Sequence, residues 1–191
     1  MSAKNAHVAE VYTQARLDPG KEFFHRRFLE REGKINPDDN PVVLASWRLL
    51  DPEGRVGMEV AVLEVAGSLV QVPLTYRPEP LPDSAGLLGE MSHSVLGTRY
   101  IYDARRDPAF RAALAALVAS GGQPVAKQDL DAGTLLPPQV EFRGVVEGGQ
   151  PVEVLVVPEE DRGAVDPGVV VGTWGVVQRR SAVLIRSQVP R

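Results

Sequence analysis

Three runs of alternating apolar and polar residues constrain the fold more than any other feature of the chain. They cover residues 42–50, 56–62 and 69–77, and the turn-forming sequences at 51–54 and 66–68 separate them. Successive side chains of a strand point to opposite faces, so each run predicts a strand with one buried face. Short connections join antiparallel neighbours, and the three runs therefore predict an antiparallel meander.

Pro73 interrupts the third of these runs. Proline has no backbone N–H to donate to a neighbouring strand. We therefore expect the strand over 69–77 to lie at a sheet edge, or to be bulged at this residue.

Two helices are predicted by the same start and stop signals, an Asp-Pro pair at the beginning and a glycine at the end. Asp18-Pro19 and Gly33 bound the first helix, and Asp107-Pro108 and Gly121 bound the second. An N-cap aspartate followed by proline at the first helical position is typical of helix starts. The apolar faces are Phe23, Phe24, Phe28 and Leu29 in the first helix, and Phe110, Leu114, Leu117 and Val118 in the second. The pattern also allows a shorter helix over 8–16.

The remaining segments are assigned by composition. Residues 78–91 are rich in proline and glycine and predict a surface crossing, after which a strand over about 95–103 returns. Residues 121–138 predict a linker. Four strands follow, over 140–146, 152–157, 169–178 and 182–187, with predicted hairpin turns at 147–150 and 179–181. The expected fold class is α+β, with an antiparallel sheet and two main helices (residues 1–120), the linker, and a small antiparallel β subdomain (139–191) that packs on the first part.

Composition excludes several classes of function. The chain has no cysteine, so it forms no disulfide, thiolate metal site or cysteine nucleophile. A net charge of -4 with both signs scattered does not resemble a nucleic-acid-binding surface. No stretch of about 18 apolar residues predicts a membrane span, and no signal core follows the first methionine. His7, His25 and His93 lie far apart, so we expect no metal site and no cofactor. We expect a cytoplasmic location.

His93, between Ser92 and Ser94, is the first candidate for chemistry. In an extended segment neighbouring side chains point to opposite faces, so neither serine can meet the imidazole. A catalytic Ser-His arrangement is therefore disfavoured, and we expect His93 to bond the backbone at the start of a strand. Ligand binding is the alternative.

Asp103 and Asp107 form the second candidate, because paired carboxylates can perform acid–base chemistry. Asp107 already caps the predicted second helix, and Asp103 is placed to hold the turn before it. Arg105 and Arg106 lie between them and favour two ionised carboxylates. Structural roles are therefore expected for both.

Four arginines lie close in sequence to the start of the predicted second helix. They are Arg99, Arg105, Arg106 and Arg111. With a helix N-terminus nearby, an anion could bind there. Local salt bridges on a solvated face are the alternative. The candidate ligand-binding residues are His93, Arg99, Arg105 and Arg106. The glycines between Gly168 and Gly175 lack the lysine and helix of a phosphate loop, so they indicate a bulge or a close approach, with Trp174 as a packing or interface residue.

Several phrases follow one another in a recognisable order. They are Asp51-Pro52-Glu53-Gly54 with Gly57-Met58-Glu59, then Gln71-Val72-Pro73-Leu74-Thr75-Tyr76-Arg77, then Ser92-His93-Ser94-Val95-Leu96-Gly97-Thr98-Arg99-Tyr100-Ile101-Tyr102-Asp103 and Asp107-Pro108. Their order and spacing resemble the N-terminal cap module of actinobacterial maltokinases and short proteins related to it, most strongly over residues 40–120. Ser92 departs from the family, which has an acidic residue at that position. The resemblance implies a cystatin-like cap, in which helices embrace a curved antiparallel sheet, followed by a further antiparallel sheet.

The resemblance concerns the part of such kinases that performs no phosphoryl transfer. That reaction needs a strand lysine, a catalytic-loop aspartate with a downstream asparagine, and a magnesium-binding aspartate. No lysine lies in a predicted strand. The leading hypothesis is a non-catalytic, stand-alone cap-like protein that binds or regulates a sugar kinase or an α-glucan enzyme. The alternatives are a module that binds a sugar or phosphorylated sugar, and a glucan-modifying enzyme using residues such as Asp103 or Glu90. A homodimer is also expected.

Overall fold

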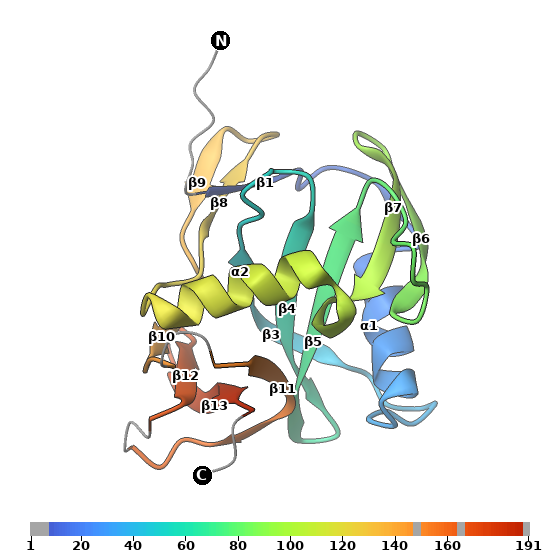
Figure 1. Cartoon of the computed structure of the whole chain (residues 1–191). Coiled ribbons are helices and arrows are strands. Elements are labelled where there is room, and N and C mark those ends of the chain that lie inside the picture. Colours follow the sequence, from blue (N-terminus) through green and yellow to red (C-terminus); the bar gives the residue numbers. More distant parts are fainter. Residues whose placement is uncertain (1–7, 147–149, 164–166, 189–191) are drawn as a thin grey trace.

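The computed structural model describes residues 8–146, 150–163 and 167–188. Its centre is a six-stranded antiparallel sheet with the order β2-β6-β7-β5-β4-β3. Helix α2 crosses one face of this sheet and α1 lies on the opposite face (Figure 1). The elements of this part are β2 (Leu17–Asp18), α1 (Lys21–Arg31), β3 (Val42–Leu49), β4 (Gly57–Val65), β5 (Ser68–Arg77), β6 (Leu87–His93), β7 (Gly97–Asp103), the 3-10 turn η1 (Ala104–Arg106) and α2 (Pro108–Ala119).

The central sheet has a separate hydrophobic cluster on each face. Phe24, Phe28 and Leu29 of α1 pack on one face, and Phe110 and Leu114 of α2 pack on the other. Strand β4 is consequently buried along both of its faces, whereas the sequence predicted alternation with one exposed face. A strand covered on both sides loses the period of two in its burial pattern. The expected meander β3-β4-β5 is confirmed.

Helix α1 begins later than the sequence predicts. Its N-cap is Gly20, and Asp18 pairs with Ser92 in β2 instead of capping the helix. Phe23, assigned to the apolar stripe, is 46% exposed and lies edge-on to Phe24 with 5.1 Å between ring centroids. The helix starts at Lys21 and not at Pro19, and its buried apolar residues are Phe24, Phe28 and Leu29. Gly33, with φ +63°, ends the helix as expected.

Strand β6 is absent from the sequence prediction, which treated residues 78–91 as a crossing. It forms a hairpin with β7, and its buried Leu88 and Met91 pack toward α1. Gly89 has φ +145° and lies at a register shift between β6 and β7. Glycine therefore marks a bulge within a strand here, and the crossing ends earlier than its composition indicates.

Strand β5 lies inside the sheet, between β4 and β7, and its register with β4 is continuous at Pro73, so neither the expected edge position nor the expected bulge is present. The pairing explains how proline is tolerated. Pro73 faces Val60 of β4, whereas the pairing with β7 begins only at Leu74, opposite Asp103. One side of β5 therefore has no hydrogen-bonded partner strand at Pro73, and a residue without an N–H costs little there.

Two further sheets complete the molecule. The first has the order β1-β8-β9 and consists of β1 (Val8–Val11), β8 (Ala126–Asp129) and β9 (Thr134–Leu136). The second has the order β10-β12-β13-β11 and consists of β10 (Val140–Arg143), β11 (Val152–Glu160), β12 (Val169–Trp174) and β13 (Arg180–Ser187). Residues 8–11 are thus a strand, and the expected helix over 8–16 is wrong. Strands β8 and β9 both fall within residues 121–138.

The C-terminal sheet differs from its prediction in one pairing. Strands β12 and β13 form the expected hairpin, but β10 pairs with β12 and β11 pairs with β13, so β10 and β11 do not form a hairpin. Three residues of the predicted turn, 147–149, lie outside the described residues. Gly172 makes a close approach, because a Cβ atom there would lie 2.9 Å from Leu184 Cγ.

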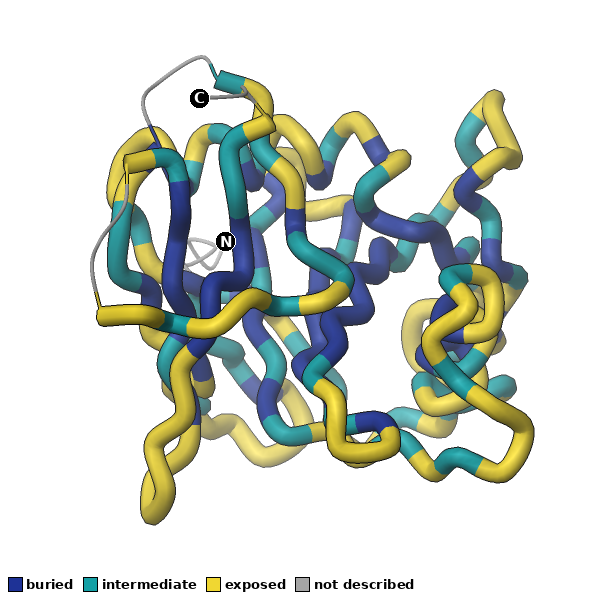
Figure 2. Tube along the Cα trace, turned by 90° about the horizontal axis from the view of Figure 1, so that it is seen from below, coloured by how far each residue is buried: buried dark blue, intermediate teal, exposed yellow. Residues whose placement is uncertain are grey.

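The C-terminal sheet shares its core with the central sheet. Val140, Trp174 and Leu184 belong to the same buried cluster as Trp47 and Phe110. Figure 2 shows the buried residues in the strands of the interior and the exposed residues on the projecting turns. The division into residues 1–120, 121–138 and 139–191 stays a prediction. Within the described ranges, neither helix combines the length and apolar character that a membrane crossing requires.

Candidate functional site

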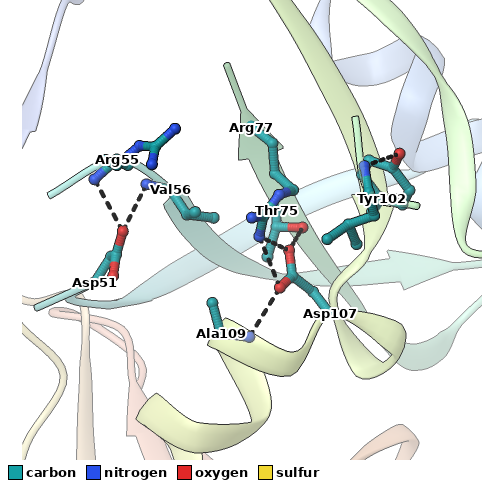
Figure 3. Close-up of polar contacts among 9 residues, drawn as sticks. Asp51, Arg55, Val56, Thr75, Arg77, Tyr102, Asp107 and Ala109 are labelled. Atoms are coloured by element: carbon teal, nitrogen blue, oxygen red, sulfur yellow. Dashed lines mark hydrogen bonds and ion pairs between the residues drawn. The ribbon is translucent and has the colours of Figure 1, made fainter. Parts of the chain in front are cut away.

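A groove of about 540 Å³ lies between α2, the β3–β4 turn and the beginning of the 78–86 crossing. This volume falls within the range usual for ligand-binding clefts. Asp51 lines this groove, and Asp107 bonds two of its lining residues, Arg77 and Ala109; Figure 3 shows both carboxylates with their partners. The groove is therefore the first candidate site.

Asp51 holds the β3–β4 turn that forms one wall. Its Oδ2 atom accepts hydrogen bonds from the backbone N–H groups of Arg55 (2.9 Å) and Val56 (2.8 Å), and its Oδ1 atom accepts one from that of Glu53 (3.1 Å). A buried carboxylate that receives three backbone donors fixes a turn tightly. Asp51 therefore gives the groove a preformed wall.

Asp107 connects two of the phrases that carry the family resemblance, residues 71–77 and Asp107-Pro108, which we call the signature phrases. It is fully buried, and it accepts hydrogen bonds from Thr75 Oγ1 (2.8 Å), from Arg77 Nη1 (2.9 Å to each oxygen) and from the backbone N–H of Ala109 (2.9 Å). The predicted N-cap role is confirmed. The carboxylate also anchors β5 to α2, so its bonds connect segments that lie 30 residues apart in the chain.

The floor of the groove offers little polar chemistry. Four alanines of α2 line it, and these are Ala109, Ala112, Ala113 and Ala116. Pro78, Pro80 and Pro82 line the facing side. On the rim, Arg55 and Glu79 form an exposed ion pair of 3.1 Å. The two buried carboxylates, Asp51 and Asp107, are occupied by backbone, threonine and arginine donors, so neither is free for acid–base chemistry.

A smaller hollow of about 270 Å³ shares Leu81 and Pro82 with the groove. The Tyr102 hydroxyl accepts a hydrogen bond from the backbone N–H of Leu81 at 2.9 Å and so holds the crossing in place. Arg106 lines this hollow and is exposed. It is the only one of the four predicted ligand-binding residues that lines either hollow.

His93 and Arg99 lie elsewhere, near the tip of the β6–β7 hairpin. His93 Nδ1 accepts hydrogen bonds from the backbone N–H groups of Val95 and Leu96, both at 3.2 Å. The expected backbone contact is therefore present, although it occurs at the end of β6 and not at a strand start. Partial burial and the charge of Arg99 lower the pKa of His93, which favours the neutral imidazole that this acceptor role needs.

Arg105 lies at the opposite end of β7 and is fully engaged. Its guanidinium contacts both oxygens of Asp103 (2.9 and 2.7 Å) and bonds Glu32 (2.6 Å), and it lies 5.0 Å from the ring centroid of Phe28. Asp103 also accepts a bond from the Arg105 backbone N–H at 3.0 Å, as its predicted turn role requires. Strand β7 separates the two ends by roughly 20 Å at about 3.3 Å per residue. The four candidates do not form one site, and their role in ligand binding stays a prediction.

A second candidate site, which sequence reasoning missed, surrounds Glu59 on the α1 side of the sheet. One oxygen, Oε2, lies 2.6 Å from Lys21 Nζ, 3.0 Å from Arg48 Nη2 and 3.5 Å from the Tyr76 hydroxyl. Arg48 and Tyr76 stand on the neighbouring strands, and Lys21 comes from α1. Burial opposes ionisation of Glu59, but Arg48 and Lys21 outweigh it and hold the pKa of this carboxyl well below its usual value.

His25 and Lys127 complete what we call the Glu59 cluster, which comprises Lys21, His25, Arg48, Glu59, Tyr76 and Lys127. Burial lowers the pKa of both His25 and Lys127, and Glu59 opposes this shift in each. Lys127 lies in β8, a strand that the sequence did not predict because residues 121–138 were assigned to a linker. The chain has only four lysines, and two of them, Lys21 and Lys127, belong to this cluster. This scarcity is the sequence feature that could have directed attention to the site.

The arrangement of helices and strands places this protein in the α+β class. It is an α+β domain in which two helices enclose a curled antiparallel sheet, and its described residues contain no group of three or more acidic or histidine side chains placed to hold a metal ion. Residues 30–107 match the family model described as the maltokinase N-terminal cap domain, and this match confirms the resemblance over that segment. No kinase catalytic domain is matched. Comparisons with curated proteins and with solved structures gave no match.

Proposed function

We propose that this chain is a non-catalytic cap-like protein that acts by binding an enzyme of sugar or α-glucan metabolism, with a sugar kinase as the first candidate. The match to the cap domain supports the link to such enzymes. The observation that carries the non-catalytic part is the use of the signature residues. Thr75 Oγ1 and Arg77 Nη1 both donate to the buried carboxylate of Asp107, so this carboxylate holds the chain together and is not free to act on a substrate.

The groove beside α2 is the proposed contact surface for the partner. Alanine and proline side chains line its floor and facing side, and they carry no group that could hydrogen-bond sugar hydroxyls. Of the charged lining side chains, Asp51, Arg77, Arg55 and Glu79 already take part in hydrogen bonds or ion pairs within the chain. Small ligands with many hydroxyls need free polar groups for orientation. An apolar segment of a protein needs only shape and apolar contact, and the small alanines let its backbone approach closely. The Arg55–Glu79 pair on the rim adds charges of both signs at the edge.

The test is direct binding between this protein and the maltokinase, or another sugar kinase, of the same organism. We expect a measurable complex in sedimentation velocity, and Ala112→Arg should weaken it at least tenfold, because Ala112 is exposed and lines the groove. Ala119→Arg is the matched control, since Ala119 is exposed on the same helix outside the groove. Equal binding by both variants, or no complex with any sugar kinase or α-glucan enzyme of that organism, would overturn the proposal.

An activity measurement addresses the non-catalytic part separately. With maltose and Mg-ATP we expect no sugar phosphate above the level formed without protein. Steady turnover that persists through successive purification steps would contradict this part. Sedimentation of the protein alone also tests the homodimer predicted from the sequence.

A second candidate function is the binding of an anionic small molecule. The arginine corner predicted from the sequence supports it weakly, because Arg105 is already paired with Asp103 and Glu32. The Glu59 cluster supports it better, since cationic side chains outnumber carboxylates within it.

A further inference from the structure

The Glu59 cluster brings basic side chains from three elements to one place. Lys21 comes from α1, Arg48 from β3 and Lys127 from β8. Arg48 faces Glu59 directly across the β3–β4 pair. The backbone N–H of Val125 donates to the carbonyl of Arg48 at 3.1 Å, which holds the start of β8 beside β3. The fold therefore assembles this cluster from residues more than 100 positions apart in the chain.

The charges inside the cluster do not balance. Lys21, Arg48 and Lys127 are cationic, and Glu59 supplies one carboxylate, so the cluster holds two more positive than negative charges. Glu22 of α1 also faces this region, but it is exposed at its edge. His25 is buried beside Glu59, and its lowered pKa favours the neutral imidazole at pH 7. Partly buried cations in excess require a counter-charge, and solvent supplies it poorly at such a site.

Several donors of the cluster have no protein acceptor. Arg48 Nε is buried without a hydrogen-bond partner, which is uncommon for a buried polar atom. The Lys127 side chain is half-buried and makes no hydrogen bond or ion pair with any other described residue. The Tyr76 hydroxyl approaches Glu59 only at 3.5 Å. The Lys21 side chain remains 33% exposed, so solvent reaches the cluster from that side.

We propose that the Glu59 cluster binds a phosphate group, with Lys127, Arg48 and Lys21 as its ligands. A phosphate monoester carries a charge of about −1.5 to −2 at pH 7 and offers three acceptor oxygens. It therefore matches both the excess of two positive charges and the unused donors. Glu59 fixes Lys21 Nζ (2.6 Å) and Arg48 Nη2 (3.0 Å) in place, while Arg48 Nε and Lys127 supply donors that no described acceptor takes. This site lies on the opposite face of the sheet from the groove and does not depend on the proposed partner.

The test is isothermal titration calorimetry of the whole chain with inorganic phosphate, and separately with glycerol 3-phosphate. Binding of both indicates recognition of the phosphate group itself, and binding of the ester alone indicates that its carrier contributes. Either result supports the site if Lys127→Gln weakens binding about tenfold or more, the loss expected for a charge-assisted hydrogen bond. Lys34→Gln is the matched control, because Lys34 is exposed beyond the end of α1. Acetate should bind more weakly than phosphate.

Three results would overturn the proposal. They are no heat of binding with either phosphate compound, equal affinity for acetate and phosphate, and an unchanged phosphate affinity in Lys127→Gln. Thermal unfolding of each variant separates a lost ligand from a lost fold. The Lys127 side chain bonds no other described residue, so its replacement should leave the unfolding temperature nearly unchanged.

Discussion

Asp107, a residue of one signature phrase, has a structural role in this protein. The residue is fully buried, and its carboxylate caps α2 while it pairs with Arg77 and Thr75 of β5. A buried charge is stable only when such partners surround it. The aspartate, threonine and arginine of the two signature phrases are therefore one structural unit, although the sequence presents them as two separate motifs.

Replacement of Asp107 by alanine should destabilise the protein strongly. The substitution removes the cap of α2 and leaves the Arg77 guanidinium without its buried partner, and we expect a loss of about 3 kcal/mol in the free energy of unfolding. Urea denaturation measures this loss. Asp38→Ala, at an exposed aspartate, is the control and should change stability by less than about 0.5 kcal/mol. A small effect at Asp107 would show that the network is dispensable.

Glu59 makes stability depend on pH. Because its folded pKa lies below the ordinary value of 4.5, its contribution is complete above that value and declines as the pH falls below it. At pH 7, Glu59→Gln leaves Arg48 and Lys21 without their carboxylate, and we expect a loss of about 3 kcal/mol, near the low end for a buried pair because Lys21 is partly exposed.

The difference in the free energy of unfolding between wild type and Glu59→Gln should become smaller between pH 5 and pH 3. In this range the unfolded wild-type chain takes up a proton at Glu59 more readily than the folded chain does. Urea unfolding at both pH values measures this difference. Glu53→Gln, at an exposed glutamate of the β3–β4 turn, should show no such narrowing. A constant difference in the free energy of unfolding across this range would rule out the assigned ionisation of Glu59.

At the scale of the elements, regular local patterns were predictable and exceptions to them were not. The alternation over residues 42–77 predicts β3, β4 and β5, and Asp107-Pro108 predicts the start of α2. Strand β6 was missed because its bulge at Gly89 follows a segment rich in proline and glycine. The start of α1 was misplaced because Asp18 is used in a strand pairing, which local sequence does not reveal.

The close approach at Gly172 gives a prediction for strand β12. A Cβ atom at this position would lie 2.9 Å from Leu184 Cγ and 3.0 Å from Val140 Cγ1, so Gly172→Ala overpacks the core. We expect a loss of about 1 to 3 kcal/mol in thermal or urea unfolding. Gly57→Ala is the matched control, because its nearest contact would be an ordinary 3.4 Å to Tyr76 Cβ. Equal effects of the two substitutions would contradict the steric explanation.

At the scale of the whole molecule, Gln71 connects the C-terminal sheet to the central one. It is fully buried in β5, where its Oε1 accepts a bond from Trp47 Nε1 (3.1 Å) and its Nε2 donates to the carbonyls of Leu155 and Leu184 (both 2.9 Å). A side-chain amide that serves three buried partners is costly to replace. Gln71 therefore fixes the position of β11 and β13 on the central sheet.

Gln71→Leu keeps the volume of the side chain but removes all three bonds. We expect a loss of roughly 3 kcal/mol, because one buried donor and two buried acceptors lose their partner. Hydrogen exchange should show reduced protection in β11 and β13 before the rest of the sheet. Gln178→Leu, at an exposed position in the β12–β13 turn, is the control. Uniform loss of protection throughout the molecule would argue against a specific role in joining the sheets.

The candidate sites were harder to predict than the fold, for a physical reason. His93, Arg99, Arg105 and Arg106 are close in sequence, yet β7 places them at its two ends and Arg105 is neutralised by Glu32 of α1. The Glu59 cluster depends on Lys127, which enters from a separate sheet beside β1. Local spacing does not reveal that β8 lies beside β3, so grouping Lys127 with Glu59 required the three-dimensional structure.

The core that the central and C-terminal sheets share extends beyond the segment that matches the cap-domain model. The matched segment ends at residue 107, but the face of β3 and β4 that carries Trp47 and Val60 is covered by α2 and the C-terminal sheet, which lie beyond it. An isolated copy of the matched segment would present that face to water. Any chain that carries this segment must therefore bring its own cover. In this chain the cover consists of apolar side chains of α2 and the C-terminal sheet, such as Phe110, Trp174 and Leu184.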